Sequence, residues 1–275
     1  MALAICEPAS SAIAGAAASD WKDGHNSRTR LIAGAVKQAD GSQKLVAGLQ
    51  IELASGWKTY WRYPGDAGGV PPELDWSKSS NVARTELLFP APIRLKDPVG
   101  DSIGYKHAVT FPVLLTPADA GKPLQLDLHI MIGVCKNICI PEEQQLTLTF
   151  DPRASDDAAV TKALQRALDE LPADAAADPE RPHIASLKVE TVAGKPALLV
   201  DAVFPAGSGG ADLFTEAVDG SFTPMPDRQD AGADGHVTFH IDLAKTDDFR
   251  TPSGKQLRLT LVSDAGASVT LQSIP

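Results

Sequence analysis

The sequence predicts a mainly β protein: two immunoglobulin-like β-sandwich domains joined by a short helix. Three observations lead to this prediction. Several segments alternate strictly between apolar and polar residues, which is typical of half-buried antiparallel strands. The same order of segments occurs twice along the chain. The 275 residues include 22 Gly and 21 Pro, a content that suits a protein rich in turns.

The clearest strand is the segment "KPLQLDLHIMIGV", residues 122–134. From Leu124 on, its even-numbered residues are apolar and share one face of the strand, whereas Asp127, His129 and Met131 share the other. Extending the alternation by one step places Cys135 on this second face. We therefore expect Cys135 to point away from the core. The residues on the core face are Leu124, Leu126, Leu128, Ile130, Ile132 and Val134.

An internal duplication sets the expected domain boundaries. Three segments of the first half each match a segment of the second half, in the same order: 40–53 with 193–204, 108–115 with 236–243, and 121–128 with 254–261. The prediction is a leader at 1–20, a first β domain at 21–151, a helix and linker at 152–183, and a second β domain at 184–275.

The linker carries the one expected helix. Ser155 is a suitable N-cap, and Val160, Leu164, Leu168 and Leu171 lie on one helical face. Pro172 is expected to end the helix.

Residues 1–20 are mostly small and apolar, and "AGAAAS" offers sites of the kind that a signal peptidase cuts. We interpret them as a secretory leader; the alternative is a disordered Ala/Ser tail. Removal of a leader containing Cys6 would leave Cys135 and Cys139. An even number of cysteines in an exported chain suggests a disulfide.

Composition and motifs exclude several classes of function. The net charge is −10, which argues against a partner made of nucleic acid or anionic lipid. No apolar run reaches the roughly 18 residues of a membrane span, so the chain is not expected to span a bilayer. The sequence also contains no phosphate-binding glycine loop, no GxSxG and no HExxH, which argues against a hydrolase or a nucleotide enzyme.

The spacing of Cys135 and Cys139 leaves three roles open: a redox pair, a structural disulfide and a metal site. A straight strand would separate the two Cα atoms by ~13 Å, whereas a disulfide needs ~4.4 to 6.8 Å. A tight reversal at residues 136–138, or one helical turn, would bring them into range. We expect Pro141 and the neighbouring isoleucines to hold Cys139 more tightly than Cys135, which follows the flexible Gly133.

An aromatic extension occurs only in the copy that carries the cysteines. It includes Trp57, Tyr60, Trp61, Tyr63 and Trp76. One or two of these rings are expected in the core, as is usual for immunoglobulin-like sandwiches. The others are expected to wall off the cysteines. The segment 89–105, with three stiffening prolines (Pro90, Pro92 and Pro98), is expected to form a loop over the same edge.

A metal site is the competing chemistry. His129 and Met131 share a face with Cys135, and thiolate, thioether and imidazole ligands together suit Cu(I). The alternative function is therefore a periplasmic copper-handling protein that uses His129, Met131, Cys135 and Cys139. A plain immunoglobulin-like binding protein with a structural disulfide is the other alternative.

Three motifs in order, "GWKTYWRYPGDAGGVPPELDW", "FPAPIRLKDPVGDSIGY" and "GVCKNICIPEE", resemble the N-terminal periplasmic domain of the thiol–disulfide reductase DsbD. The resemblance is closest to relatives of the ScsB type, which are linked to copper tolerance and carry two immunoglobulin-like modules. It covers residues 21–151 strongly and the second domain loosely.

The resemblance implies a redox relay in the periplasm that acts like a protein-disulfide reductase and uses no cofactor. Cys135 and Cys139 would cycle between dithiol and disulfide and pass electrons to thioredoxin-like proteins, with Cys139 meeting the partner and Cys135 resolving the mixed disulfide. Tyr60, Trp61, Tyr63 and Tyr105 match the aromatic shield. The sequence lacks the transmembrane and thioredoxin-like domains of DsbD, so a separate membrane protein would have to donate the electrons.

Overall fold

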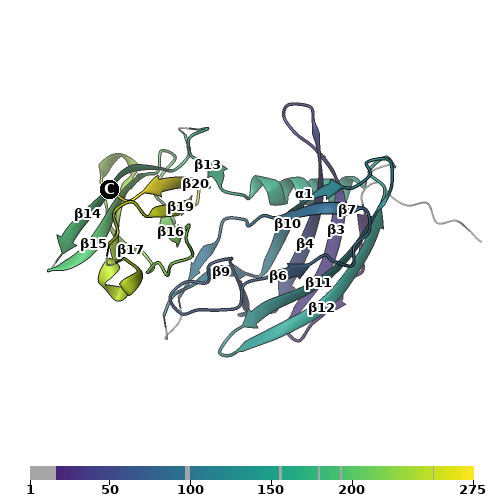
Figure 1. Cartoon of the computed structure of the whole chain (residues 1–275), viewed down its shortest axis with the longest axis horizontal. Helices are drawn as coiled ribbons and strands as arrows, with labels where there is room; N and C mark the ends of the chain where they lie inside the picture. The colour runs from purple at the N-terminus through teal and green to yellow at the C-terminus, as the bar shows by residue number, and fades with distance from the viewer. Residues whose placement is uncertain (1–16, 97–99, 155–156, 179, 193, 250) are drawn as a thin grey trace, which may run out of the picture.

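The computed structural model describes residues 17–96, 100–154, 157–178, 180–192, 194–249 and 251–275. They form two lobes that lie side by side, each built from two β-sheets (Figure 1). The first lobe comprises residues 17–150 and the second comprises residues 173–274. This arrangement confirms the predicted class, a mainly β protein of two sandwiches.

One sheet of the first lobe has the order β1-β3-β4-β10-β7, and β2 also pairs with β3. The central strands are long because mostly apolar segments, such as "RLIAGAV" and "KLVAGLQIEL", meet in antiparallel register. The strands are β1 (Ala17–Ala18), β2 (Lys22–Asp23), β3 (Ser27–Lys37), β4 (Gln43–Leu53), β7 (Val82–Leu87) and β10 (Ala108–Pro117).

The facing sheet of the first lobe has the order β12-β11-β5-β9-β8, and β6 also pairs with β11. The longest strands of this sheet, β11 and β12, form a hairpin, and β5 and β6 pair with β11. The strands are β5 (Lys58–Tyr60), β6 (Glu73–Asp75), β8 (Ile93–Leu95), β9 (Ser102–Lys106), β11 (Leu124–Cys135) and β12 (Cys139–Phe150).

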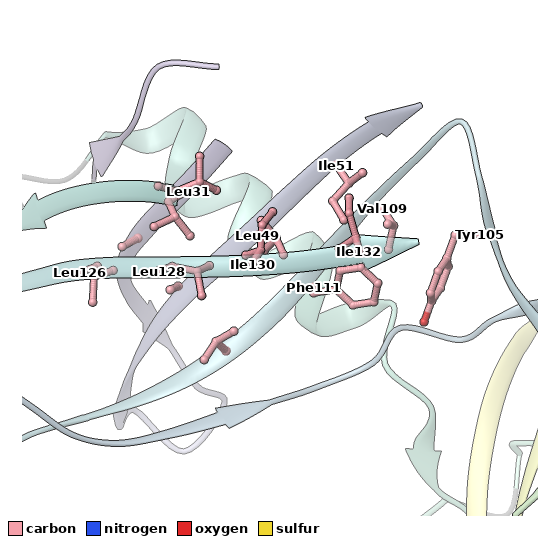
Figure 2. Close-up of a cluster of buried hydrophobic side chains, with 14 of the residues drawn as sticks. Leu31, Leu49, Ile51, Tyr105, Val109, Phe111, Leu126, Leu128, Ile130 and Ile132 are labelled. Carbon is pink, nitrogen blue, oxygen red and sulfur yellow. The ribbon is translucent and has the colours of Figure 1, made fainter. Parts of the chain in front are cut away.

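The core of the first lobe lies between these sheets (Figure 2). The even-numbered residues of β11 point into it, as the alternation predicts, and Leu31, Leu49 and Phe111 face them from the other sheet. Burial of these side chains supplies the main driving force for folding of the lobe. Tyr105 lies at one end of the cluster.

The second lobe has sheets of order β14-β15-β18-β17 and β13-β20-β19-β16. Phe204, Phe239 and Phe249 are buried at its centre. Its strands are β13 (Ala173–Asp174), β14 (His183–Val192), β15 (Lys195–Val203), β16 (Asp212–Ala217), β17 (Asp227–Ala231), β18 (His236–Asp242), β19 (Gln256–Ser263) and β20 (Gly266–Ser273), with short 3₁₀ turns η1 (Ala233–Gly235), η2 (Leu243–Lys245) and η3 (Asp247–Phe249).

The two lobes share a strand order, in agreement with the inferred duplication. In the first lobe β4 pairs with β3 and β10; in the second, β15 pairs with β14 and β18. The matched segments of the sequence occupy these equivalent strands, and β11 corresponds in the same way to β19.

The helix α1 (Ala158–Asp169) lies on the outer side of the first sheet (Figure 1). Asp157 is its N-cap and accepts hydrogen bonds from the backbone N–H groups of Ala159 and Val160. The predicted N-cap, Ser155, lies outside the described residues. Val160 and Leu164 pack against Ile32, Val36 and Val46.

Two boundaries differ from the sequence prediction. The helix ends at Asp169, before Pro172, because Glu170 already serves as its C-cap. Ala17 and Ala18 pair with Ala33 and Ile32 of β3, so the end of the expected leader segment belongs to the first lobe. Among the described residues, no helix is long and apolar enough to cross a membrane.

Candidate functional site

The two cysteines close the β11–β12 hairpin. Cys135 is the last residue of β11, Cys139 is the first of β12, and the two are direct cross-strand partners. Their Cα atoms are 4.2 Å apart, and their sulfurs form a disulfide. The chain reverses at residues 136–138, where the N–H of Lys136 donates to the carbonyl of Ile138. Of the two geometries left open by the sequence, this is the tight reversal.

The two sulfur-bearing residues differ in exposure. Cys135 is 1% exposed, whereas Cys139 is exposed. The residues around Cys139 were expected to hold it more tightly than Cys135, but Ile138 does not anchor the turn, because it is 69% exposed. Cys139 is therefore the sulfur that a large molecule can reach, and Cys135 lies behind it.

Cys135 points away from the core, as predicted, but a second segment covers it. The chain from β5 to β6 runs along the edge of β11: Lys58 pairs with Cys135, the carbonyl of Val70 accepts from the N–H of Gly133, and β6 pairs farther along. Between Tyr60 and Val70 the chain leaves the edge and then returns. This excursion buries a face of β11 that the alternation alone predicts to be open.

Tyr60 is the aromatic residue in contact with the disulfide. Its ring is 3% exposed, and its hydroxyl oxygen lies 3.0 Å from the sulfur of Cys139. Two glycines permit this position. A Cβ at Gly69 would lie 2.3 Å from the Tyr60 ring, and a Cβ at Gly133 would lie 2.8 Å from the Cβ of Val70. Side chains at these two sites would push the covering segment off the strand.

Residues 64–70 form what we call the cap loop. Hydrogen bonds to β9 and the residue before it hold the loop in place: the N–H of Ile103 donates to the carbonyl of Pro64, and the N–H of Ala67 donates to that of Asp101. The loop borders a cavity of about 290 Å³ beside the disulfide. The cavity is lined by Lys58, Tyr60, Ala67, Gly68, Ser102, Cys135, Lys136, Asn137, Ile138 and Cys139.

A buried cation lies in this cavity. Lys58 is only 9% exposed, and its ammonium group donates to the hydroxyl of Ser102 at 3.1 Å. Lys106, Lys58, Cys135 and Cys139 are successive cross-strand partners on four neighbouring strands. Direct partners in antiparallel strands place their side chains on the same face. The positively charged Lys58 therefore belongs to the same row of cross-strand partners as the two cysteines.

The other three aromatics of the predicted shield lie elsewhere. Trp61 is fully buried in the core, 6.0 Å between ring centroids from Phe214 of the second lobe. Tyr105 packs edge-on against Phe111, and its hydroxyl donates to the carbonyl of Pro90. Burial raises the pKa of Tyr105 well above its usual value.

Tyr63 exchanges two hydrogen bonds with Thr223 of the second lobe. Only Tyr60 of the four is among the residues lining the cavity. The proposed shield therefore reduces to Tyr60 and the cap loop.

The segment 89–105 is not a loop over the cysteines. Its described residues form the antiparallel strands β8 and β9, which extend the sheet beyond β5. Pro98, one of the expected stiffeners, lies outside the described residues. This segment contributes Ser102, which binds Lys58, and the carbonyl of Asp101 and the N–H of Ile103, which hold the cap loop.

The copper-binding set is not brought together. His129 and Met131 share a face with Cys135, but they lie six and four residues away along a regular strand, which is ~20 and ~13 Å. His129 instead lies 3.5 Å from Glu143. In the part of the chain that the structure describes, no cluster of three or more His, Cys, Asp or Glu side chains could hold a metal ion.

Sequence reasoning missed Lys58, Ser102 and the cap glycines. A signal existed for the glycines, because "PGDAGG" is rich in residues that favour positive φ, and Gly65, Gly68 and Gly69 all adopt it. No local signal identifies Lys58, because its role depends on pairing with a strand about 75 residues later.

Comparison with known proteins gives a consistent picture. Residues 32–151 match the family described as "Thiol:disulfide interchange protein DsbD, N-terminal". The crystal structure of the N-terminal periplasmic domain of ScsB from Proteus mirabilis is similar, with a TM-score of 0.71 and 22% identity over 94% of this chain and 98% of that one. Bovine butyrophilin matches with a TM-score of 0.21 and 13% identity over 84% of this chain and 91% of that one, too weak to support an argument. No curated protein matches.

The family match covers both cysteines, Tyr60 and the whole cap loop, and the similarity to the ScsB domain extends the common fold to the second lobe. These findings support a DsbD-type N-terminal domain over residues 32–151.

Proposed function

We propose that this protein is a periplasmic thiol–disulfide exchange module that relays reducing equivalents through Cys135 and Cys139 to thioredoxin-like partners. One observation carries the proposal. The disulfide lies at the tip of a hairpin with one exposed and one buried cysteine, and a tyrosine hydroxyl contacts the sulfur of the exposed one. The redox function belongs to the domain of residues 21–151, and the domain of residues 184–275 carries no cysteine.

The exchange proceeds in two balanced steps. In the reduced protein, the Cys139 thiolate attacks a disulfide sulfur of the partner, and one partner thiolate leaves. The Cys135 thiolate then attacks the sulfur of Cys139, which closes the intramolecular disulfide and releases the second partner thiolate. Two electrons and two protons pass in total from this protein to the partner.

The exposure of the two cysteines supports this division of roles. A partner disulfide can approach Cys139 from solvent, whereas Cys135 is covered by Tyr60 and the cap loop. Because the hairpin register fixes the two residues opposite each other, Cys135 is in position to resolve the mixed disulfide without a rearrangement of the backbone. A separate membrane protein would regenerate the dithiol with two electrons.

The test uses single Cys→Ser variants and a thioredoxin-like partner that lacks its own resolving cysteine. Both variants also carry Cys6→Ser, and the one remaining cysteine of each is first converted to its mixed disulfide with thionitrobenzoate. The partner thiolate can then displace thionitrobenzoate, which is coloured, and form a stable mixed disulfide. Cys135→Ser should react rapidly and yield the covalent complex, and Cys139→Ser should not. Comparable trapping by both variants, or by neither, would overturn the proposal.

The reduction potential separates exchange from a structural role. A structural disulfide has a potential below about −300 mV, whereas an exchanging pair lies higher. Equilibration of the native protein with glutathione and dithiothreitol buffers measures this potential directly.

A further inference from the structure

We propose that the second lobe positions the cap loop, and that Tyr63 and Asp66 are the positioning residues through which it does so. This inference rests on the proposed exchange function and assigns a task to the lobe without cysteines. The consequence is that the contact between the lobes sets how fast thiols reach the disulfide.

The cap loop and the residues before it are held by one segment of the second lobe, residues 223–226. The hydroxyl of Tyr63 donates to the carbonyl of Thr223 at 2.8 Å and accepts from the N–H of the same residue at 2.9 Å. The carboxylate of Asp66 accepts from the N–H of Met225 at 2.9 Å. Between them, Gly65 adopts positive φ and lies against the sulfur of Met225, which a Cβ there would approach to 3.2 Å.

The holding segment is stiff and well anchored. Its sequence is Thr-Pro-Met-Pro, in which each proline fixes its own φ, and all four residues are buried. Two acidic residues of β16 also bind the second lobe to the first lobe. Arg62 forms a bidentate ion pair with Glu216, and Arg94 forms one with Asp212. The segment therefore acts on the loop as a fixed support and not as a mobile neighbour.

The path from this support to the disulfide is short. Asp66 is followed directly by Ala67 and Gly68, both of which line the cavity beside Cys135 and Cys139. The next residue, Gly69, lies against the ring of Tyr60, whose hydroxyl contacts the Cys139 sulfur. A shift of the loop at Asp66 would therefore also move the next three residues, Ala67 to Gly69, which cover the disulfide.

The same geometry limits what the second lobe can influence. Neither Tyr63 nor Asp66 lines the cavity, so their loss changes access and leaves the groups around the sulfurs in place. Reduction and reoxidation should both become faster by the same factor, and the equilibrium potential should stay the same. A residue with a merely structural role would not produce this combination.

The experiment measures the second-order rate constants for reduction of the full chain by glutathione and for its reoxidation by glutathione disulfide. Tyr63→Phe and Asp66→Ala each remove hydrogen bonds to the holding segment. Loss of about 1 kcal/mol of hydrogen bonding would raise the population of open loop, and hence both rate constants, about fivefold. The potential of each variant should match that of the native protein.

The matched control is Asp212→Asn. It weakens the bidentate ion pair between Arg94 and Asp212 and leaves in place the other two contacts of Arg94, to the carbonyl of Pro226 in the holding segment and to Asp101. Its rate constants should remain close to the native values. Equal acceleration in Asp212→Asn would show that any loosening of the interface suffices, and native rates in both loop variants would show that the second lobe does not position the loop. Either result would overturn the inference.

Failure of the inference can be told from failure of the proposed function. The trapping reaction of Cys135→Ser keeps the loop contacts intact and reports only on the exchange chemistry. If trapping is normal and the loop variants react with glutathione at native rates, only the inference about the second lobe is contradicted. If trapping is absent but glutathione reduces the loop variants faster, the exchange function is contradicted, and the control of access by the second lobe is supported. Thermal unfolding of each variant verifies that it is folded.

Discussion

Lys58 and Cys135 are direct cross-strand partners, so their side chains lie on the same face of the sheet, and both buried residues line the cavity beside the disulfide. Adjacent strands lie ~4.8 Å apart, which brings the lysine stem next to the cysteine. Once the disulfide is reduced, the positive charge favours the thiolate over the thiol because a nearby opposite charge stabilises the ionised form.

Replacement of Lys58 by Met should therefore raise the pKa of the cysteine thiols in the reduced protein. A rise of about one unit is expected for the loss of a neighbouring charge, and it would lower the thiolate fraction at neutral pH about tenfold. The pH dependence of alkylation by iodoacetamide measures this pKa.

Lys106→Met is the matched control for this variant. Lys106 lies in the same row of residues but one strand farther away, and it is exposed to solvent. Solvent screens its charge, so its removal should leave the alkylation profile close to native. An equal effect of both variants would show that net charge, and not the buried ammonium, controls the thiols.

Tyr60→Phe removes the hydroxyl beside Cys139 and keeps the ring that packs on the glycines. A hydrogen bond to a charged group contributes about 1.5 to 3 kcal/mol. The Cys139 thiolate should lose this stabilisation, so the pKa of Cys139 should rise by roughly one to two units. The alkylation profile of Cys135→Ser in a chain that also carries Cys6→Ser, with and without Tyr60→Phe, isolates this cysteine. Tyr105→Phe removes a hydroxyl that binds Pro90 and should leave the profile unchanged.

Gly133→Ala should displace the cap loop. The new Cβ would lie 2.8 Å from Val70 Cβ and 2.9 Å from its carbonyl oxygen, closer than packed atoms allow. Overpacking of this kind costs typically 1–3 kcal/mol. In the reduced variant, Cys135 should become open to alkylation by bulky maleimides that do not reach it in the native protein. Gly121→Ala, in the turn before β11, serves as the control, and protection of Cys135 in both variants would contradict the role assigned to the loop.

High pH should weaken the contact between Tyr63 and the second lobe. Burial raises the pKa of Tyr63 above 10.0, so the folded protein holds the phenol proton more tightly than the unfolded chain does. The contribution of Tyr63 to the stability of the folded protein is complete below about pH 10, the usual tyrosine pKa. It is lost as the pH rises through the pKa of Tyr63 in the folded protein. Reduction by dithiothreitol at matched thiolate concentration should accelerate across this range in the native protein. Tyr63→Phe should show no such step.

Much of the fold could be predicted from local sequence. Strict alternation predicted a strand at residues 122–134, which overlaps β11 (Leu124–Cys135), and the correct face for Cys135, because successive side chains of a strand point to opposite faces. The resemblance, and not the alternation, assigned Trp61 and Tyr63 to the aromatic shield. Lys58 and Tyr60 of β5 point to the cysteine face, whereas Trp61 is buried in the core and Tyr63 binds Thr223 of the second lobe.

The interface between the lobes left no periodic signal in the sequence. Arg62 and Glu216 are both ordinary charged residues on short segments, and nothing local shows that they meet as a bidentate pair. The exposure of Cys139 was missed for a related reason: Pro141 and Ile138 predict a rigid turn, but rigidity of the backbone does not bury a side chain. Relations of this kind depend on packing between distant segments.

The register of the β11–β12 hairpin has a consequence for repeated turnover. Twelve consecutive cross-strand pairs hold the two cysteines opposite each other, whether or not a bond joins their sulfurs. The disulfide closes a ring of so few residues that its loss restores only about 2 kcal/mol of chain entropy to the unfolded state. Oxidised and reduced forms should thus melt within several degrees of each other. The molecule can gain and lose two electrons over many cycles without approaching its unfolding transition.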